Sequence, residues 1–328
     1  SEMQRLQMVT QEGSNVCACA VQGNFDDAQN GVKDLFANPD FNREILEAGY
    51  HLSSANSINI GRLVPQVAYY VYAYSKLVLE KKIKCGDEIN VVVPTGNFGN
   101  ILAAYYAKQM GLPIRRLVCA SNRNNVLTDF FHNGAYMAKR TFYKTMSPSM
   151  DILVSSNLER LLFELCGRDE KMVSAWMASL KKEGKYEVPA NVVEKMQKDF
   201  WAGCCDDVQT SQTIKQVYDE YGYLMDTHTA VAWTVYEEFK KETGEDIPTV
   251  IASTANPFKF VPDVLYSLTG EETGEDIFGA AKKLEDYTGF QIPERIGELK
   301  TKPVLYHGDV KKNELRDVIL QFVEKING

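Results

Sequence analysis

The sequence has no apolar run of about 18 residues, the length that a helix needs to cross a bilayer. It also has no clustered stripe of Lys and Arg, and its 36 basic and 44 acidic residues give a net charge of −8. Nucleic-acid binding depends on positive charge that faces the phosphates, so this acidic chain is a poor candidate for it. The sequence therefore predicts no membrane segment and no nucleic-acid partner.

Cysteines at metal-binding or redox spacing are missing as well. The seven cysteines are odd in number, include no Cys-x-x-Cys pair and have no histidine at metal-ligand spacing. Because free Cys packs like a small apolar residue, we interpret all seven as core filling and expect no metal site. Unpaired thiols are typical of a reducing compartment, which predicts the cytoplasm.

The chain does have the material for a sizeable core, since 45% of its 328 residues are hydrophobic. The β-branched run at 89–93 is typical of a strand buried on both faces. A helical pattern at 97–110 and a second strand at 116–120 follow it. This alternation predicts an α/β fold with an open, mostly parallel sheet flanked by helices.

Periodicity predicts further elements on both sides of this unit. They are a strand at 16–21, helices at 26–37 and 61–79, a mostly helical stretch at 158–221, a helix at 227–243, a strand at 249–253, and helices at 280–286 and 313–324. Asn157 and Asp207 are predicted N-caps. We expect the first strand to leave an unpaired edge, which favours self-association. The start at Ser1 is neither a signal peptide nor an initiator Met, so we expect a longer parent protein.

The segment 94–100, Pro-Thr-Gly-Asn-Phe-Gly-Asn, is the most informative stretch of the sequence. It follows a buried strand and opens a helix, where free N–H groups and the positive dipole end favour an anion. Gly96 and Gly99 permit a tight turn and a close approach to the backbone. The pattern is neither G-x-G-x-x-G nor a Walker loop, and taken alone it fits a phosphate site and an ordinary turn about equally.

Two further polar segments are weaker candidates. The string 53–59, followed by Arg62, offers a second anion site, although an Asx or Ser turn with an N-cap is its commoner fate. Thr254 follows a strand and is a candidate hydroxyl contact at the sheet's ligand edge. His228 follows Asp226 at a helix start, where a capping or satisfied core histidine is expected rather than a base.

Taken together, these segments resemble the threonine synthase family, whose members are pyridoxal-phosphate enzymes with the tryptophan-synthase-β-like fold (type II). The matching segments occur in the family's order over essentially the whole chain: Leu52–Asn59, Pro94–Asn100, Thr145–Asp151, Asn157–Leu161, Asp226–Ala232 and Thr254–Phe260. Several motifs in one order are far more specific than any one of them. They favour the phosphate-site interpretation of 94–100.

The resemblance implies a role for each matching residue. Main-chain N–H groups of Gly96, Asn97, Phe98, Gly99 and Asn100 would hold the phosphate of pyridoxal 5'-phosphate. Thr254 would face the pyridine nitrogen of the cofactor. Asn56, Ser57 and Arg62 would bind the phosphate of the substrate O-phospho-L-homoserine, which the family converts with water to L-threonine and phosphate.

The sequence departs from the family in its N-terminal part. The family's Schiff-base lysine lies in a Phe-Lys-Asp segment followed by Ser-Gly-Asp-Thr-Gly, and neither segment occurs here. Lys259, in Phe258-Lys259-Phe260, belongs to a later motif and is interpreted as a structural or phosphate-side charge. We therefore expect residues 1–60 to be a remnant of a smaller cofactor-side α/β domain. Residues 61–328 would form the large domain, with a helical insertion at about 155–225.

The expected function is that of a threonine synthase portion that is inactive alone, because covalent catalysis needs the lysine. One alternative is another lyase of the same fold, such as a threonine dehydratase, which needs no site for a substrate phosphate. Another is a non-catalytic protein that binds a phosphorylated metabolite through Gly96–Asn100.

Overall fold

The computed structural model describes residues 1–23, 25–274 and 276–327. The chain divides into two compact units, Ser1–Ser54 with Gln291–Gly328, and Ala55–Phe290. The expected division at residue 60 placed the C-terminal segment in the large domain, whereas here this segment packs with the N-terminal one. The assignment of the first unit to a smaller cofactor-side domain stays a prediction.

The first unit is held together by contacts between the two chain ends. Strand β1 (Ala20–Val21) pairs in parallel with β8 (Asp309–Val310). Arg316 forms an ion pair with Glu44, and Phe41 is buried with Val323. Its helices are α1 (Glu2–Val9), α2 (Phe25–Phe36), α3 (Pro39–Glu47), α15 (Glu294–Gly297) and α16 (Leu315–Asn327).

The expected strand at 16–21 is therefore shorter, and its last two residues are paired. The partner strand lies almost 290 residues further along the chain, so no local sequence pattern indicates this pairing. The expected helix at 26–37 matches α2 within one residue at each end.

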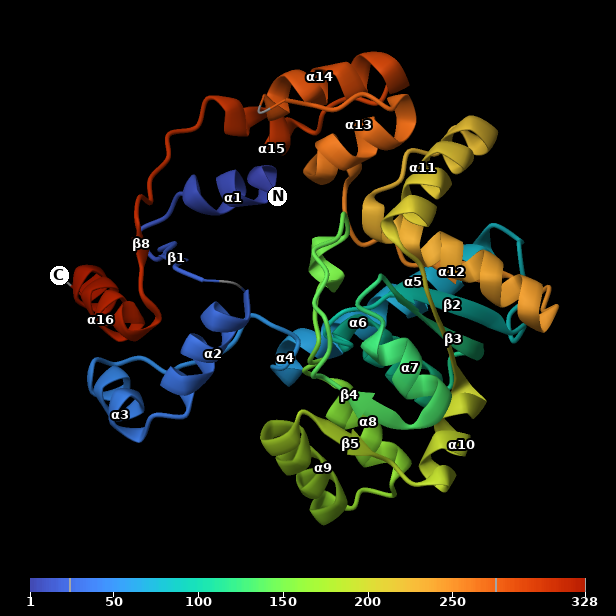
Figure 1. Cartoon of the computed structure of the whole chain (residues 1–328), viewed down its shortest axis with the longest axis horizontal. Helices are drawn as coiled ribbons and strands as arrows, with labels where there is room; N and C mark the ends of the chain where they lie inside the picture. The colour runs from blue at the N-terminus through green and yellow to red at the C-terminus, as the bar shows by residue number, and fades with distance from the viewer. Residues whose placement is uncertain (24, 275, 328) are drawn as a thin grey trace. The chain divides into compact units, whose positions relative to one another are not determined.

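The second unit contains a four-stranded parallel sheet in the order β6-β3-β2-β7 (Figure 1). The strands are β2 (Ile89–Pro94), β3 (Ile114–Ser121), β6 (Phe200–Cys204) and β7 (Thr249–Ile251). Every residue of β2 is buried. Val91 and Val93 pack into one hydrophobic cluster and Val92 into another, so the sheet is covered on both faces as the β-branched run predicts.

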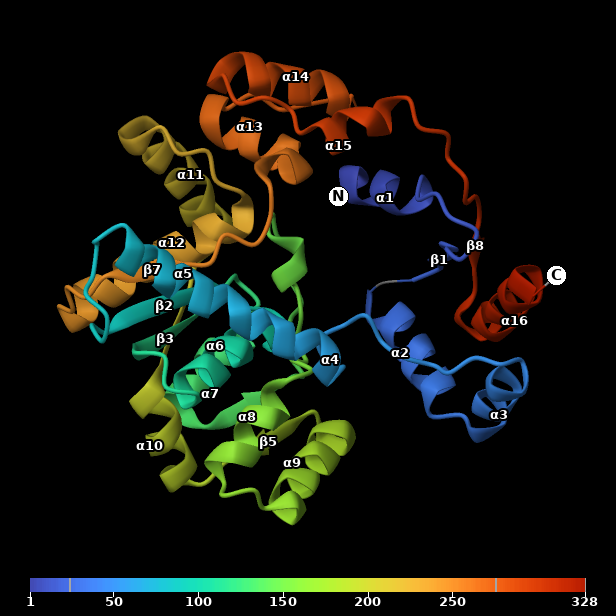
Figure 2. The same ribbon diagram turned by 180° about the vertical axis from the view of Figure 1, so that it is seen from behind.

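Helices from different parts of the chain cover the two faces (Figures 1 and 2). One face carries α5 (Val67–Leu79), α6 (Gly99–Gln109), α7 (Val126–Asn133), α8 (Leu158–Leu165) and α10 (Ala190–Asp199). The other face carries α12 (Thr227–Thr243). The remaining elements are α4 (Ile60–Leu63), α9 (Glu170–Glu183), α11 (Asp207–Tyr221), α13 (Val261–Thr269), α14 (Ile277–Thr288) and the antiparallel pair β4 (Ala135–Met137) and β5 (Lys185–Glu187).

The expected helical stretch at 158–221 is interrupted, because β5 and the sheet strand β6 lie inside it. The run Phe200-Trp201-Ala202-Gly203-Cys204 is too short for periodicity to separate strand from helix, and pairing with β3 decides. The predicted cap Asp207 is off by one residue. Asp206 caps α11, accepting from Gln209 N, and Asp207 is the helix's first residue.

Candidate functional site

The loop between β2 and α6 presents a run of main-chain amide groups at the start of a helix. Thr95 N donates to Ala120 O, which continues the sheet pairing. The N–H groups of residues 96–100 donate to no protein acceptor in the part of the chain that the structure describes. They are the last turn residues before α6 and its first N–H donors, where a helix leaves groups open for an anion.

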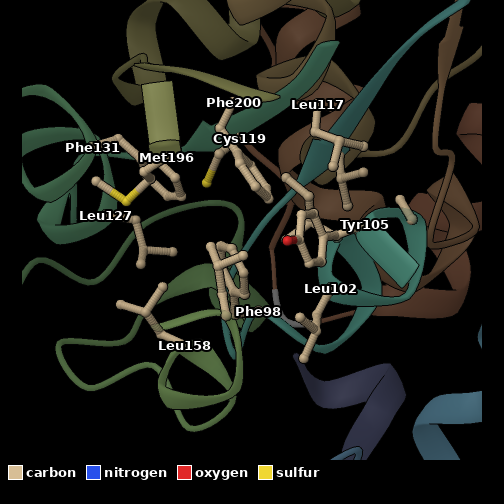
Figure 3. Packing of buried hydrophobic residues seen from close by; sticks show 14 of the residues in the cluster. Phe98, Leu102, Tyr105, Leu117, Cys119, Leu127, Phe131, Leu158, Met196 and Phe200 are labelled. Atoms are coloured by element: carbon tan, nitrogen blue, oxygen red, sulfur yellow. The ribbon is translucent and has the colours of Figure 1, made fainter. Parts of the chain in front are cut away.

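The side chain of Phe98 fixes this loop by packing into the hydrophobic core. This residue has φ 62°, a left-handed conformation that costs about 1–2 kcal/mol for a residue with a β-carbon. Phe98 is 1% exposed, and its ring centroid lies 6.0 Å from the ring centroids of both Phe131 and Phe200. The three residues belong to the cluster that Figure 3 shows. Burial of a Phe side chain contributes about 1.5–3 kcal/mol, which offsets the strain and fixes the loop at the core.

The two glycines of the loop lie against neighbouring segments. A β-carbon at Gly96 would lie 2.7 Å from Ser149 O, and one at Gly99 would overlap Ser57 Oγ. From the sequence, both glycines were expected to permit a close approach of a ligand to the backbone. The structure shows that protein atoms already occupy the space beside each of them.

The carbonyl groups of the loop are held by the segment before α8. Ser155 Oγ donates to Gly96 O at 2.9 Å, and Asn157 Nδ2 donates to Asn97 O at 2.8 Å. Asn157 was predicted as an N-cap; it occupies that position, but its side chain makes no capping hydrogen bond. Sequence reasoning missed Ser155, because nothing in the adjacent residues shows that its hydroxyl reaches a carbonyl 59 residues earlier.

A pocket of about 200 Å³ opens at the loop. It is lined by residues 93–101 together with Ser57, Gln66 and Ser149. Of the three residues expected to bind a substrate phosphate, only Ser57 lines it. Asn56 and Arg62 are exposed, and Arg62 Nε donates to Ala55 O. Gln66 was not singled out from the sequence, because it lies in a helical pattern.

Thr254 is exposed and lines a neighbouring pocket of about 410 Å³ with Tyr69, Tyr70 and Asn100. Asn100 lines both pockets, so they adjoin at this residue. Tyr70 Oη donates to Asn100 Oδ1, and burial raises the pKa of the Tyr70 phenol, which keeps this hydroxyl protonated.

His228 is a satisfied core residue, as expected, and it supports the loop indirectly. Its Nδ1 lies 3.1 Å from Asp226 Oδ1, and its Nε2 accepts from Ser149 N at 3.1 Å. Asp226, fully buried, also caps α12 by accepting from His228 N and Thr229 N. The carbonyl oxygen of Ser149 is the atom nearest to a β-carbon built at Gly96, so His228 contacts the same residue that packs against the loop.

No protein-family model matches the chain. The human protein threonine synthase-like 1 is 42% identical over 277 residues, which are 84% of this chain and 37% of that protein. Threonine synthase of Saccharomyces cerevisiae is 38% identical over 284 residues, which are 82% of this chain and 54% of the yeast protein.

A solved structure decides the fold. The crystal structure of PLP-bound threonine synthase from Brucella melitensis matches at a TM-score of 0.81 and 35% identity, covering 100% of this chain and 63% of that one. This chain is homologous to the threonine synthases. This confirms the resemblance seen in the sequence. It also confirms the expected α/β fold, a mostly parallel sheet flanked by helices.

The chain spans about a third to a half of the curated relatives it matches, and less than two thirds of the solved structure. None of the described helices has the length and hydropathy that crossing a membrane requires. The cytoplasmic location and self-association stay predictions.

Proposed function

We propose that this chain is the portion of a pyridoxal-phosphate-dependent threonine synthase that binds the cofactor phosphate through the amides of Gly96–Asn100. The observation that carries the proposal is the run of N–H groups at the start of α6 that have no acceptor among the described residues, in a loop that lines a pocket of about 200 Å³. Homology to threonine synthases over most of the chain supports it.

The residues present fit a phosphate ester. The oxygen Oδ1 of Asn97 is buried and has no hydrogen-bond partner among the described residues. Buried polar atoms are rarely left unpaired, so this side chain is suited to a ligand hydroxyl or a bridging water. A β-carbon at Gly96 or Gly99 would meet Ser149 or Ser57, so the fit depends on the open amides and not on space left by the glycines.

Thr254 and Arg62 take the other roles in this proposal. Thr254 would place its hydroxyl toward the pyridine nitrogen, in the pocket that adjoins the loop at Asn100. Arg62 uses Nε for Ala55 O, and its other N–H groups have no partner among the described residues. With Asn56 and Ser57 it would bind the phosphate of O-phospho-L-homoserine, since a guanidinium fork matches that group.

When bound, pyridoxal 5'-phosphate supplies the electron sink for carbanion chemistry. This chain's amides at 96–100 would hold the phosphate and the Thr254 hydroxyl would contact the ring, while burial keeps Tyr70 as a neutral hydrogen-bond donor to Asn100. In the parent protein the overall reaction would be O-phospho-L-homoserine and water to L-threonine and phosphate. Because this sequence lacks the Phe-Lys-Asp segment, we expect no turnover by the chain alone.

Calorimetric titration with pyridoxal 5'-phosphate, pyridoxal and inorganic phosphate tests the proposal. We expect the phosphate ester to bind at least tenfold more tightly than pyridoxal, and inorganic phosphate to compete with it. Equal affinity for the two aldehydes would overturn the phosphate-site assignment. Release of threonine from O-phospho-L-homoserine by the purified chain would overturn the expectation that it is inactive alone.

A further inference from the structure

The amides of the loop can bind an anion only if they point into the pocket, and two side chains outside the loop set that direction. We propose that Ser155 and Asn157 are positioning residues that aim the N–H groups of Asn97 and Phe98. The inference rests on the proposed phosphate site. Neither residue lines the pocket, so neither touches the anion in this assignment.

The geometry of the peptide bond carries the first step. In a trans peptide the C=O and N–H groups point in opposite directions, and the chain has no cis peptide among its described residues. The carbonyl of Gly96 points to Ser155 Oγ, and that of Asn97 points to Asn157 Nδ2. The N–H groups of Asn97 and Phe98 therefore point away from the 155–157 segment.

The second step is that the two donors are themselves held in place. Arg160 Nη1 donates to Asn157 Oδ1 at 2.7 Å and to Ser57 O at 2.9 Å, which leaves the amide end of Asn157 facing Asn97. The main-chain N–H of Ser155 donates to Tyr136 Oη at 2.9 Å. Both Ser155 and Asn157 are buried, so water does not compete freely for their hydrogen bonds.

The third step concerns what Asn157 does not do. An Asn at an N-cap ordinarily accepts from a main-chain N–H of its own helix, which stabilises the helix. Asn157 occupies the N-cap of α8 without making that bond. Its Nδ2 donates to Asn97 O and its Oδ1 accepts from Arg160 Nη1. The side chain therefore connects the loop with Arg160 instead of capping α8.

The experiment compares Ser155→Ala, Asn157→Ala and the restoring variant Ser155→Thr in the 328-residue chain, with exposed Asn191→Ala in α10 as the control. Inorganic phosphate is the probe, titrated by calorimetry. Amide chemical shifts of Asn97 and Phe98 are followed by NMR, and urea midpoints report folding. We expect each Ala variant to bind phosphate about three- to tenfold more weakly and to shift both amides before phosphate is added. Ser155→Thr and Asn191→Ala should match the parent chain.

The outcomes separate the two proposals. If the parent chain itself fails to bind phosphate, the proposed function is wrong, and the positioning role falls with it. If the parent chain binds and both Ala variants bind equally well with unshifted amides, only the positioning role is wrong. If Asn157→Ala unfolds, Ser155→Ala decides the question, because it removes one buried hydroxyl and leaves Arg160 its partners.

Discussion

Ser57 Oγ occupies the space that a β-carbon at Gly99 would need. Ser57 lies in the turn before α4, and Gly99 is the first residue of α6. Arg160 reinforces this contact by donating to the carbonyls of Ser57 and Ile58. The absence of a side chain at Gly99 therefore lets the turn at 56–59 close onto the start of α6.

Gly99→Ala should destabilise the chain by about 1–3 kcal/mol, because the added methyl group is forced against Ser57. Ser57→Gly removes the opposing side chain, so the double variant should recover most of the loss. Urea unfolding of the four chains measures this coupling, and Gly297→Ala, where space is open to 3.9 Å, is the control. Additive effects of the two substitutions would contradict the contact.

Asn97→Ala should weaken phosphate binding less than Gly99→Val does. In the proposed site main-chain N–H groups carry the binding, and removing the Asn97 side chain leaves them in place. The valine adds branched bulk against Ser57 and disturbs the start of the helix. Titration with inorganic phosphate ranks the two variants; a larger loss for Asn97→Ala would mean that the side chain binds the anion.

Arg62→Ala should reduce O-phospho-L-homoserine binding by about 1.5–3 kcal/mol, the usual worth of a charge-assisted hydrogen bond. Pyridoxal 5'-phosphate binding should stay unchanged, because Arg62 does not line the loop pocket. Calorimetry with each ligand measures the difference, and Arg43→Ala, exposed in the other unit, serves as the control. Equal losses for both ligands would refute the substrate-phosphate assignment.

His228→Asn and His228→Gln separate the two bonds of this side chain. Asn keeps a donor near Asp226 but loses the acceptor for Ser149 N, whereas Gln keeps an acceptor at the position of Nε2. We expect His228→Asn to release the 148–150 turn from Gly96 and to weaken phosphate binding. His228→Gln should bind better than His228→Asn. His51→Asn, at an exposed histidine, should change nothing.

Thiol titration tests the state of the cysteines. All seven are free, and burial raises the pKa of the Cys119 thiol to about 12 and that of Cys205 to about 11. Only the thiolate reacts, so both of these thiols should be almost unreactive at pH 8. Cys17 and Cys85 are exposed, so the interpretation as core filling is wrong for these two, and they should react with Ellman's reagent first. Cys119 and Cys205 should react only on unfolding or as pH rises toward their pKa values, and fewer than seven thiols in denaturant would indicate a disulfide.

Elements with a strong local signal were predictable from the sequence. The run 89–93 is β-branched throughout and became the fully buried β2, and Thr227–Thr243 matches α12 at both ends. The helix expected at 61–79 is confirmed over 67–79, although Pro65 introduces a 3-10 turn between α4 and α5. The loop proposed to bind phosphate could be singled out because glycines between a strand and a helix leave a signature in adjacent residues.

The remaining features depend on contacts between residues far apart in the chain. Strand β6 exists because it pairs with β3, about 80 residues earlier, and β1 because it pairs with β8. The Asn157 side chain donates to the carbonyl of Asn97, 60 residues away, instead of capping its own helix. Ser57 contacts Gly99 only in the folded chain. Local propensity determines which segments become helices and strands. Only the tertiary structure, through burial and pairing across long loops, decided which polar side chains support the loop and which, like Arg62, stay outside its pocket.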